Sequence, residues 1–250
     1  GWSEPVYAHI PLIHGADGAK LSKGHGALGV EAYRDDLGIL PEALNNYLLR
    51  LGWGHGDEEV ISRERAVELF DLSGVGKSPS RFDLAKLQSL NGMYIRDADD
   101  GRLADLVAAR IGKGADRDLL RKAMPALKPR AKDLDELAQG AAFLFAQRPL
   151  DLSEKAAALL TAEARELLFS VHDALGKQAD WTIETLEASL KAMAAEREIG
   201  LGKLAQPLRA ALTGQTTSPG IFDVLVLLGR EESLARIAVQ ARAPAASQAQ

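Results

Sequence analysis

Apolar residues recur at spacings of three and four along most of the chain after residue 97, and this spacing is typical of amphipathic helices. Ile183, Leu186, Leu190 and Met193, for example, step by three, four and three along one predicted helix. The second half of the chain carries no alternating pattern of the kind that strands show. We therefore predict that this half is entirely helical.

Proline and glycine mark the predicted ends of the last helices. One helix is predicted to begin at Pro207 and to end at Gly214. Ser218 is predicted to cap the next helix, which covers Ile221 to Leu228 and ends at Gly229. These assignments rest on the preference of serine for N-caps, of proline for the first helical position and of glycine for the end.

Before residue 97 the pattern predicts shorter helices separated by turns. Ser62 is placed to cap one of them, with Val67 and Phe70 on its inward face. Another is predicted from Phe82 to Leu90, and the Asn91-Gly92 pair is predicted to end it, because both residue types favour turns.

The first residues read differently. Val6 to Ile13 is apolar and partly β-branched, which predicts a short buried strand. Ala16-Asp17-Gly18 is a turn sequence, and Lys20 and Lys23 follow it on a glycine-containing stretch. Two ammonium groups on a mobile loop suit a ligand that develops charge during a reaction, such as a triphosphate attacked at one phosphorus.

Composition narrows the class of protein. The chain has 250 residues, a net charge of −5 and no cysteine, so disulfides and thiolate metal sites are excluded. No apolar run approaches the roughly 20 residues that span a bilayer. The five histidines lack cysteine or carboxylate partners at metal-ligand spacing, so we expect no zinc.

Charge is unevenly distributed. Between residues 110 and 132 there are eight basic residues against two acidic ones. The basic residues are Arg110, Lys113, Arg117, Arg121, Lys122, Lys128, Arg130 and Lys132. Such a stretch is suited to a phosphate backbone. A solvated helix face, neutralised by neighbouring side chains, is the alternative interpretation.

Gly74-Val75-Gly76-Lys77-Ser78 imitates the end of a phosphate-binding P-loop. That motif needs a glycine five residues before Gly76, where this chain has Asp71, and a helix that continues after the serine. Pro79 biases Ser78 away from the helical region. We therefore reject the P-loop interpretation.

Lys20-Leu21-Ser22-Lys23 resembles the second signature of class I aminoacyl-tRNA synthetases. The flanking Ala8 to Ile13, Gly15 to Ala19 and His25 to Ala27 narrow the resemblance to bacterial glutamyl-tRNA synthetases. The resemblance implies that Lys20, Leu21, Ser22 and Lys23 bind ATP, with Lys23 as the catalytic residue and with Lys20 and Ser22 shaping the loop. We interpret the histidines as structural or solvent-facing, and a place near the nucleotide is the alternative for His25. The family usually has arginine after the second lysine, and this chain has Gly24.

Later phrases extend the resemblance to nearly the whole chain. Residues 43–53 and 82–91 resemble the stem-contact domain of these enzymes, and 206–214 and 218–223 resemble their distal anticodon domain. The implied fold is mainly α. It comprises the end of a class I catalytic domain with a short β hairpin and the signature loop (1–26), a helical stem-contact domain (27–97), two helical anticodon-binding subdomains (98–150 and 151–242) and a disordered tail (243–250).

The implied function is the C-terminal, tRNA-binding part of a glutamate–tRNA ligase. The first class I signature, usually His-Ile-Gly-His, is missing, so we expect a fragment cut before the second signature rather than a natural stand-alone paralogue, and we expect the fragment alone to be inactive. A helical second half argues against glutaminyl-tRNA synthetase, whose anticodon region is made of β-barrels, and against the short paralogue that glutamylates a modified tRNA base.

The resemblance implies ATP with Mg²⁺, glutamate and tRNA(Glu) as ligands of the full enzyme, with the eight basic residues as candidate tRNA contacts. It further implies a cytoplasmic monomer with no membrane partner. The alternative from another class is a non-catalytic helical RNA-binding or scaffolding module.

Overall fold

The computed structural model describes residues 1–23 and 27–242. Gly24 and His25, and the tail predicted to be disordered, lie outside the described residues. None of the helices in the described ranges combines the length and the apolar character that crossing a bilayer requires.

The chain divides into two compact units, which are described separately here. The first comprises residues 1–110 and 128–137, and the second comprises residues 111–127 and 138–250. Both are built mainly from helices, and the mainly α fold that the sequence predicts is confirmed.

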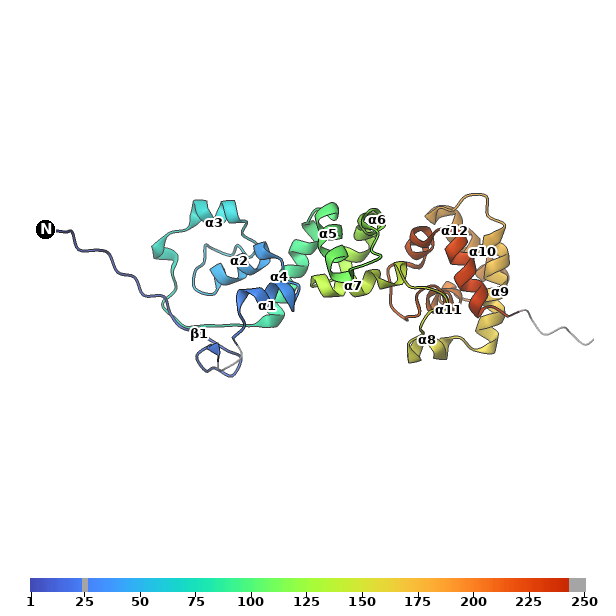
Figure 1. Cartoon of the computed structure of the whole chain (residues 1–250), viewed down its shortest axis with the longest axis horizontal. Coiled ribbons are helices and arrows are strands. Elements are labelled where there is room, and N and C mark those ends of the chain that lie inside the picture. The colour runs from blue at the N-terminus through green and yellow to red at the C-terminus, as the bar shows by residue number, and fades with distance from the viewer. Residues whose placement is uncertain (24–26, 243–250) are drawn as a thin grey trace, which may run out of the picture. The chain divides into compact units, whose positions relative to one another are not determined.

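The first unit contains the short sheet and the helices from α1 to α5 (Figure 1). Its two strands, β1 (Ile13–His14) and β2 (Ser80–Arg81), pair in parallel. Its helical elements are α1 (Val30–Asp35), α2 (Pro41–Arg50), α3 (Arg63–Leu69), η2 (Leu72–Gly74), α4 (Leu84–Asp97), nearly all of α5 (Asp100–Ile111), η3 (Lys128–Arg130) and the first half of α7 (Leu134–Ala141).

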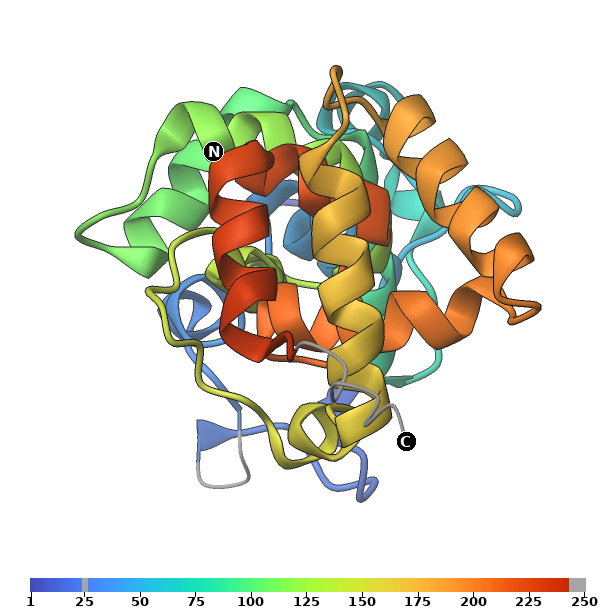
Figure 2. The same cartoon turned by 90° about the vertical axis from the view of Figure 1, so that its right-hand side faces the viewer.

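The second unit is a helical bundle. It consists of α6 (Arg117–Leu127), η4 (Ala142–Leu144), α8 (Glu154–Leu159), α9 (Ala162–Gly176), α10 (Ile183–Glu196), α11 (Leu201–Thr213) and α12 (Ile221–Gln240). Figure 2 shows α12 running beside α9, and α11 also packs against both helices. Leu168, Leu190, Leu208 and Ile237 are fully buried among them.

The buried strand predicted for Val6 to Ile13 is wrong except at its end. Only Ile13 is paired, while Val6 is 91% and Ile10 is 75% exposed. A strand is stable only where a neighbouring strand satisfies its backbone groups. Strand β2 is two residues long and reaches only Ile13 and His14, so the residues before Leu12 have no pairing partner in the described chain.

Helix α3 has the predicted cap but not the predicted inward face. Ser62 Oγ accepts a hydrogen bond from the Arg65 backbone N–H at 3.1 Å, as expected of an N-cap. Val67 and Phe70, however, are exposed, and no residue of α3 is buried. The helix is held at one end and packs lightly on α2.

Asn91 and Gly92 do not end a helix; they lie inside α4 and are both buried. The Asn91 side chain accepts from the Leu40 backbone N–H at 2.9 Å and donates to the Lys132 carbonyl at 2.7 Å. A Cβ at position 92 would lie 3.4 Å from the Ala131 carbonyl oxygen. Tertiary contacts to the 131–132 segment therefore override the turn preference of both residues.

In the second unit one predicted helix start and one predicted cap are also wrong, whereas the predicted start at Ile221 is confirmed. Helix α11 begins six residues before Pro207, which lies in its buried interior. Helix α12 begins after Gly220, with no side-chain cap from Ser218. Gly214 ends α11 as predicted, with a φ of 71°. Gly229 has a φ of 76° and interrupts α12 with a kink, so the helix from Ile221 stops there as predicted and a second helical segment follows it within α12.

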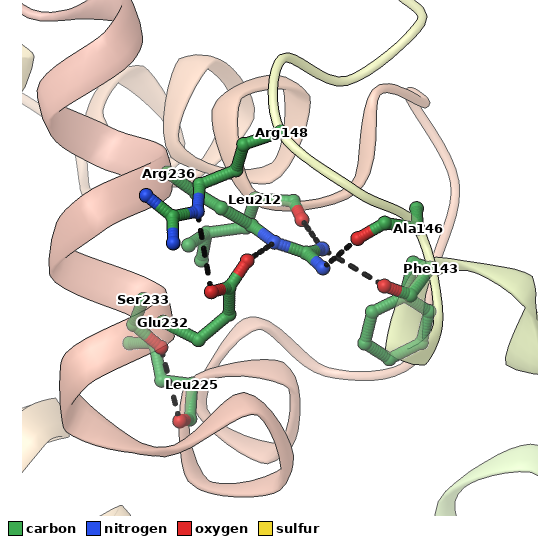
Figure 3. A network of polar contacts seen from close by, with 8 residues as sticks. All are labelled: Phe143, Ala146, Arg148, Leu212, Leu225, Glu232, Ser233 and Arg236. Atoms are coloured by element: carbon green, nitrogen blue, oxygen red, sulfur yellow. Dashed lines mark hydrogen bonds and ion pairs between the residues drawn. The ribbon is translucent and has the colours of Figure 1, made fainter. Parts of the chain in front are cut away.

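A buried arginine, Arg236, links several segments of the second unit (Figure 3). The Arg236 guanidinium donates to the carbonyl oxygens of Phe143, Leu212 and Ala146 at 2.7–2.8 Å, and its Nε donates to Glu232 at 2.7 Å. Leu212 lies in the last turn of α11, where a helix leaves carbonyls without an internal partner. One side chain thus satisfies carbonyls from α11, from η4 and from the irregular segment after η4.

Candidate functional site

A tight turn places the first lysine of the signature. The Gly15 backbone N–H donates to the Ala19 carbonyl at 2.9 Å, and Gly18 has a φ of 80°. The Asp17 carboxylate accepts from the Ala19 N–H at 3.0 Å and so fixes the turn. The turn chemistry predicted for residues 16–18 is confirmed, and it brings Lys20 opposite His14 in an antiparallel bridge.

The signature residues follow directly. Lys20 and Lys23 are exposed, whereas Leu21 and Ser22 are partly buried. The Leu21 N–H donates to the Ile13 carbonyl at 2.9 Å, and the Ser22 carbonyl accepts from the Ala27 N–H at 3.1 Å. In the described part of the chain, neither lysine forms an ion pair, so both ammonium groups are open to an anionic ligand.

Strand β2 pairs with β1 on the side away from Lys20. The Ser80 N–H donates to the Leu12 carbonyl at 3.2 Å, and the Phe82 N–H donates to the His14 carbonyl at 2.8 Å. The segment that imitates a P-loop leads through Pro79 into this strand and not into a helix. Rejection of the P-loop is therefore confirmed.

Aromatic side chains anchor the junction between β2 and α4. The Phe82 ring packs edge-on against Tyr47 at 5.2 Å and lies 5.9 Å from the Tyr33 ring. The Tyr47 hydroxyl accepts from the Asp83 N–H at 2.6 Å. Burial raises the pKa of both tyrosines, which keeps them neutral. Tyr47 and Trp53 are both buried in the core of this unit.

The eight basic candidates separate into two classes. Arg110 is 19% exposed and pairs with Asp135, and its guanidinium also donates to the Arg34 carbonyl at 2.6 Å. Lys128 is 13% exposed and donates to Asp100 at 2.7 Å and to the Ala98 carbonyl at 2.6 Å. These two charges are neutralised within the fold.

The other six candidates are exposed: Lys113, Arg117, Arg121, Lys122, Arg130 and Lys132. They fall in different units, since Arg130 and Lys132 belong to the first and the remaining four to the second. Arg121 also meets Asp118 at 3.6 Å, an exposed pair of small energetic weight. The predicted basic stretch is therefore two separate sets of cations.

Two exposed arginines near these sites escaped the sequence analysis. Arg96 Nη1 and the Lys132 Cα each lie 3.5 Å from the point where a Gly92 Cβ would be, so Arg96 joins the Lys132 set. Arg81 is the register partner of His14. Neither is signalled by local spacing, because each is brought to its site by a contact between distant segments. Within the described ranges, no three His, Cys, Asp or Glu side chains gather in a way that would hold a metal ion.

The geometry agrees with the proteins that the chain resembles. Residues 1–89 match the family described as "tRNA synthetases class I (E and Q), catalytic domain", and residues 102–241 match the family described as "Anticodon binding domain". "Glutamate–tRNA ligase 1" of Erythrobacter litoralis is 70% identical over 241 residues, which are 96% of this chain and 50% of the relative.

Other relatives agree. "Glutamate–tRNA ligase 2" of Rhizorhabdus wittichii is 67% identical over 95% of this chain and 52% of its own length. The crystal structure of a glutamate tRNA ligase from Elizabethkingia meningosepticum superposes with a TM-score of 0.83 at 27% identity, over 96% of this chain and 52% of that one. The chain thus spans about half the length of the curated relatives it matches.

Proposed function

The chain belongs to the glutamyl-tRNA synthetase family, and from that premise we propose that it is the tRNA-binding part of a glutamate–tRNA ligase. The whole protein joins glutamate to ATP as glutamyl-adenylate with release of pyrophosphate, and then transfers the glutamyl group to tRNA(Glu). The observation that carries this proposal is that two signature lysines, which are exposed and form no ion pair with the described residues, occur in one chain with a match to an anticodon-binding domain.

In the first step Lys23 stabilises the charge that develops on the phosphates as the glutamate carboxylate attacks. An ammonium group aimed at developing charge lowers the barrier without taking part in bond making. Lys20 and Ser22 hold the loop, with Leu21 as its partly buried anchor. Mg²⁺ accompanies ATP, as it does in phosphate chemistry generally.

The helical regions bind the tRNA. We propose stem contact for residues 27–97 and anticodon binding for 98–150 and 151–242, with residues 1–26 completing the catalytic domain. The exposed cations meet phosphates and so position the RNA, whereas bases are read by other contacts. Arg110 and Lys128 are left out of this proposal because their charges are used within the fold. We place the protein in the cytoplasm as a monomer.

Two measurements test the proposal. Glutamate-dependent ATP–pyrophosphate exchange is expected from the whole protein and only background exchange from the 250-residue chain. The 250-residue chain is expected to bind tRNA(Glu) more tightly than an unrelated tRNA in filter binding. Equal affinity for both tRNAs would favour the scaffolding alternative, and exchange by the short chain alone would contradict its assignment as a non-catalytic part.

The salt dependence of tRNA binding tests which residues contact the RNA phosphates. Each phosphate contact contributes roughly −0.9 to the slope of log K against log salt on a duplex. Reversing Arg130 and Lys132 to glutamate is expected to reduce the slope by about 2 if both meet phosphate. The matched control is reversal of Arg110, which is expected to damage folding and leave the slope of the remaining folded protein unchanged. A slope unmoved by the double reversal removes these two residues from the RNA face.

A further inference from the structure

Three basic side chains lie in register across the small sheet at the signature loop. His14 is bridged to Lys20 on one side and is the register partner of Arg81 on the other. Residues paired directly across neighbouring strands present their side chains to the same face of a sheet. Strands lie about 4.8 Å apart, so the Lys20 and Arg81 backbones are roughly 10 Å apart with His14 between them.

The Arg81 guanidinium turns toward the loop. Its Nη2 lies 3.4 Å from the point where a Cβ on Gly18 would be, directly over the turn that delivers Lys20. Gly18 has a positive φ and carries no side chain there, which leaves room for the guanidinium. Arg81 is thus placed beside the signature although it is distant from it in sequence.

No acid in the described part of the chain neutralises Arg81. The side chain is exposed, and the structure records no hydrogen bond or ion pair for it. Asp83, two residues from Arg81 in sequence, caps α4 by accepting from the Lys86 N–H at 3.2 Å, and Asp17, next to Gly18, accepts from the Ala19 N–H at 3.0 Å. Neither carboxylate pairs with Arg81, so the face that carries His14, Lys20 and Arg81 offers basic side chains to an anionic ligand.

We propose that Arg81 is a third cation of the nucleotide site, binding the polyphosphate of ATP together with Lys20 and Lys23. This inference rests on the proposed function. Position 24, where the resemblance leads one to expect arginine, is glycine. Arg81 supplies a guanidinium to the same loop from the neighbouring strand, and a guanidinium suits phosphate oxygens because its N–H groups form a planar fork.

The backbone beside Arg81 is held by packing and by a hydrogen bond. The neighbouring Phe82 packs against Tyr33 and Tyr47, and the Phe82 N–H is bonded to His14. A cation on a fixed backbone meets the phosphates as ATP binds and keeps the contact through the reaction. Such uniform binding changes KM and leaves kcat nearly unchanged, whereas a contact made only in the transition state changes kcat.

The test is ATP–pyrophosphate exchange by the whole protein at saturating glutamate. Arg81→Ala is expected to raise KM for ATP about 10-fold, as loss of one charge-assisted contact does, with kcat changed less than about twofold. Arg81→Lys is expected to recover part of the loss. The control is Lys86→Ala, which removes an exposed positive charge from α4 five residues away and is expected to leave KM unchanged.

A second measurement separates this inference from the proposed function. Binding of inorganic triphosphate to the 250-residue chain is followed by chemical-shift changes, with circular dichroism to show that each variant is folded. Arg81→Ala is expected to weaken this binding even if exchange is absent, in which case the proposed function alone fails. An unchanged KM in an active enzyme, an equal effect of Lys86→Ala, or triphosphate binding that does not depend on Arg81 would each overturn the inference.

Discussion

Arg236 and Arg81 show how burial changes the role of an arginine side chain. Arg236 is 1% exposed, and four of its N–H donors are taken by three carbonyls and Glu232. Arg81 is exposed and has no recorded partner in the described residues. A buried guanidinium must be satisfied by the fold, since an unpaired buried charge is very costly. An exposed one is satisfied by water and remains available to an anion.

The same division sorts the other cations. Arg110 and Lys128 resemble Arg236, because their partners come from the fold and their side chains are largely covered. Lys20 and Lys23 resemble Arg81. A count of positive charges in a stretch of sequence therefore overestimates the charge that is available to bind RNA or a nucleotide. The first class contributes to the stability of the fold, and the second class is the one to which the proposed binding and catalysis are assigned.

The largest effect is expected for Arg236→Met. Two buried carbonyls, the partly buried Ala146 carbonyl and the Glu232 carboxylate lose their donor, and breaking a buried ionic network from one side typically costs about 3–5 kcal/mol. We expect a loss of this size in the free energy of opening of α11 and α12, measured by native-state hydrogen exchange. Arg121→Met, at a 60% exposed side chain, is the control and is expected to change stability by less than about 0.5 kcal/mol. A loss below about 1 kcal/mol for Arg236→Met would show that the network is not needed.

The next effect is similar in size and is expected for Lys23→Ala in the whole protein. It concerns the rate of the reaction and not the stability of the fold. Removing one preorganised electrostatic contact typically lowers a rate by two to three decades, or about 3–4 kcal/mol. Exchange kinetics should show this fall mainly in kcat, while the free energy of unfolding changes by less than about 0.5 kcal/mol. Lys86→Ala is again the control. If Lys23→Ala changes tRNA affinity and not the exchange rate, the loop has been assigned to the wrong step.

Local chemistry explains what the sequence predicted well. The turn at residues 16–18, the Ser62 cap and the glycine ends at 214 and 229 depend on the backbone preferences of single residues. The signature loop was found because its residues are adjacent in sequence. Long amphipathic helices such as Ile183–Glu196 were found from their period.

Several of the failures involve segments that meet only after folding. Asn91 and Gly92 favour turns locally, but contacts to residues 131–132 hold them inside α4. Pro207 favours a helix start, but burial of the helix before and after it outweighs this preference. The place of Arg81 beside the signature depends on the register of β2 with β1, which no local pattern encodes.

The smallest effect is expected for an ion pair whose exposure lies between that of the covered cations and that of the exposed ones. Arg102 donates to Glu42 through both of its terminal nitrogens, at 2.5 and 3.1 Å, and the side chains are 44% and 31% exposed. The hydrogen bond from Arg102 lowers the pKa of Glu42 below its ordinary value of 4.5. A carboxyl whose pKa is lower in the folded state stabilises the fold above its unfolded pKa, and this contribution is lost as pH falls through the folded pKa.

We therefore expect Glu42→Gln to lower the free energy of unfolding by about 0.5–1 kcal/mol at pH 7, a small value because both side chains are partly solvated. The difference from wild type should shrink as the pH falls below about 4.5 and the wild-type carboxyl takes up its proton. Glu4→Gln, in the exposed N-terminal segment, is the control and is expected to show no difference at either pH. Urea unfolding at pH 7 and near pH 4 measures both variants. A difference between Glu42→Gln and wild type that stays constant or grows on acidification would mean that the ion pair with Arg102 does not stabilise the fold. Glu42 would then contribute no more to stability than an exposed charge without a partner.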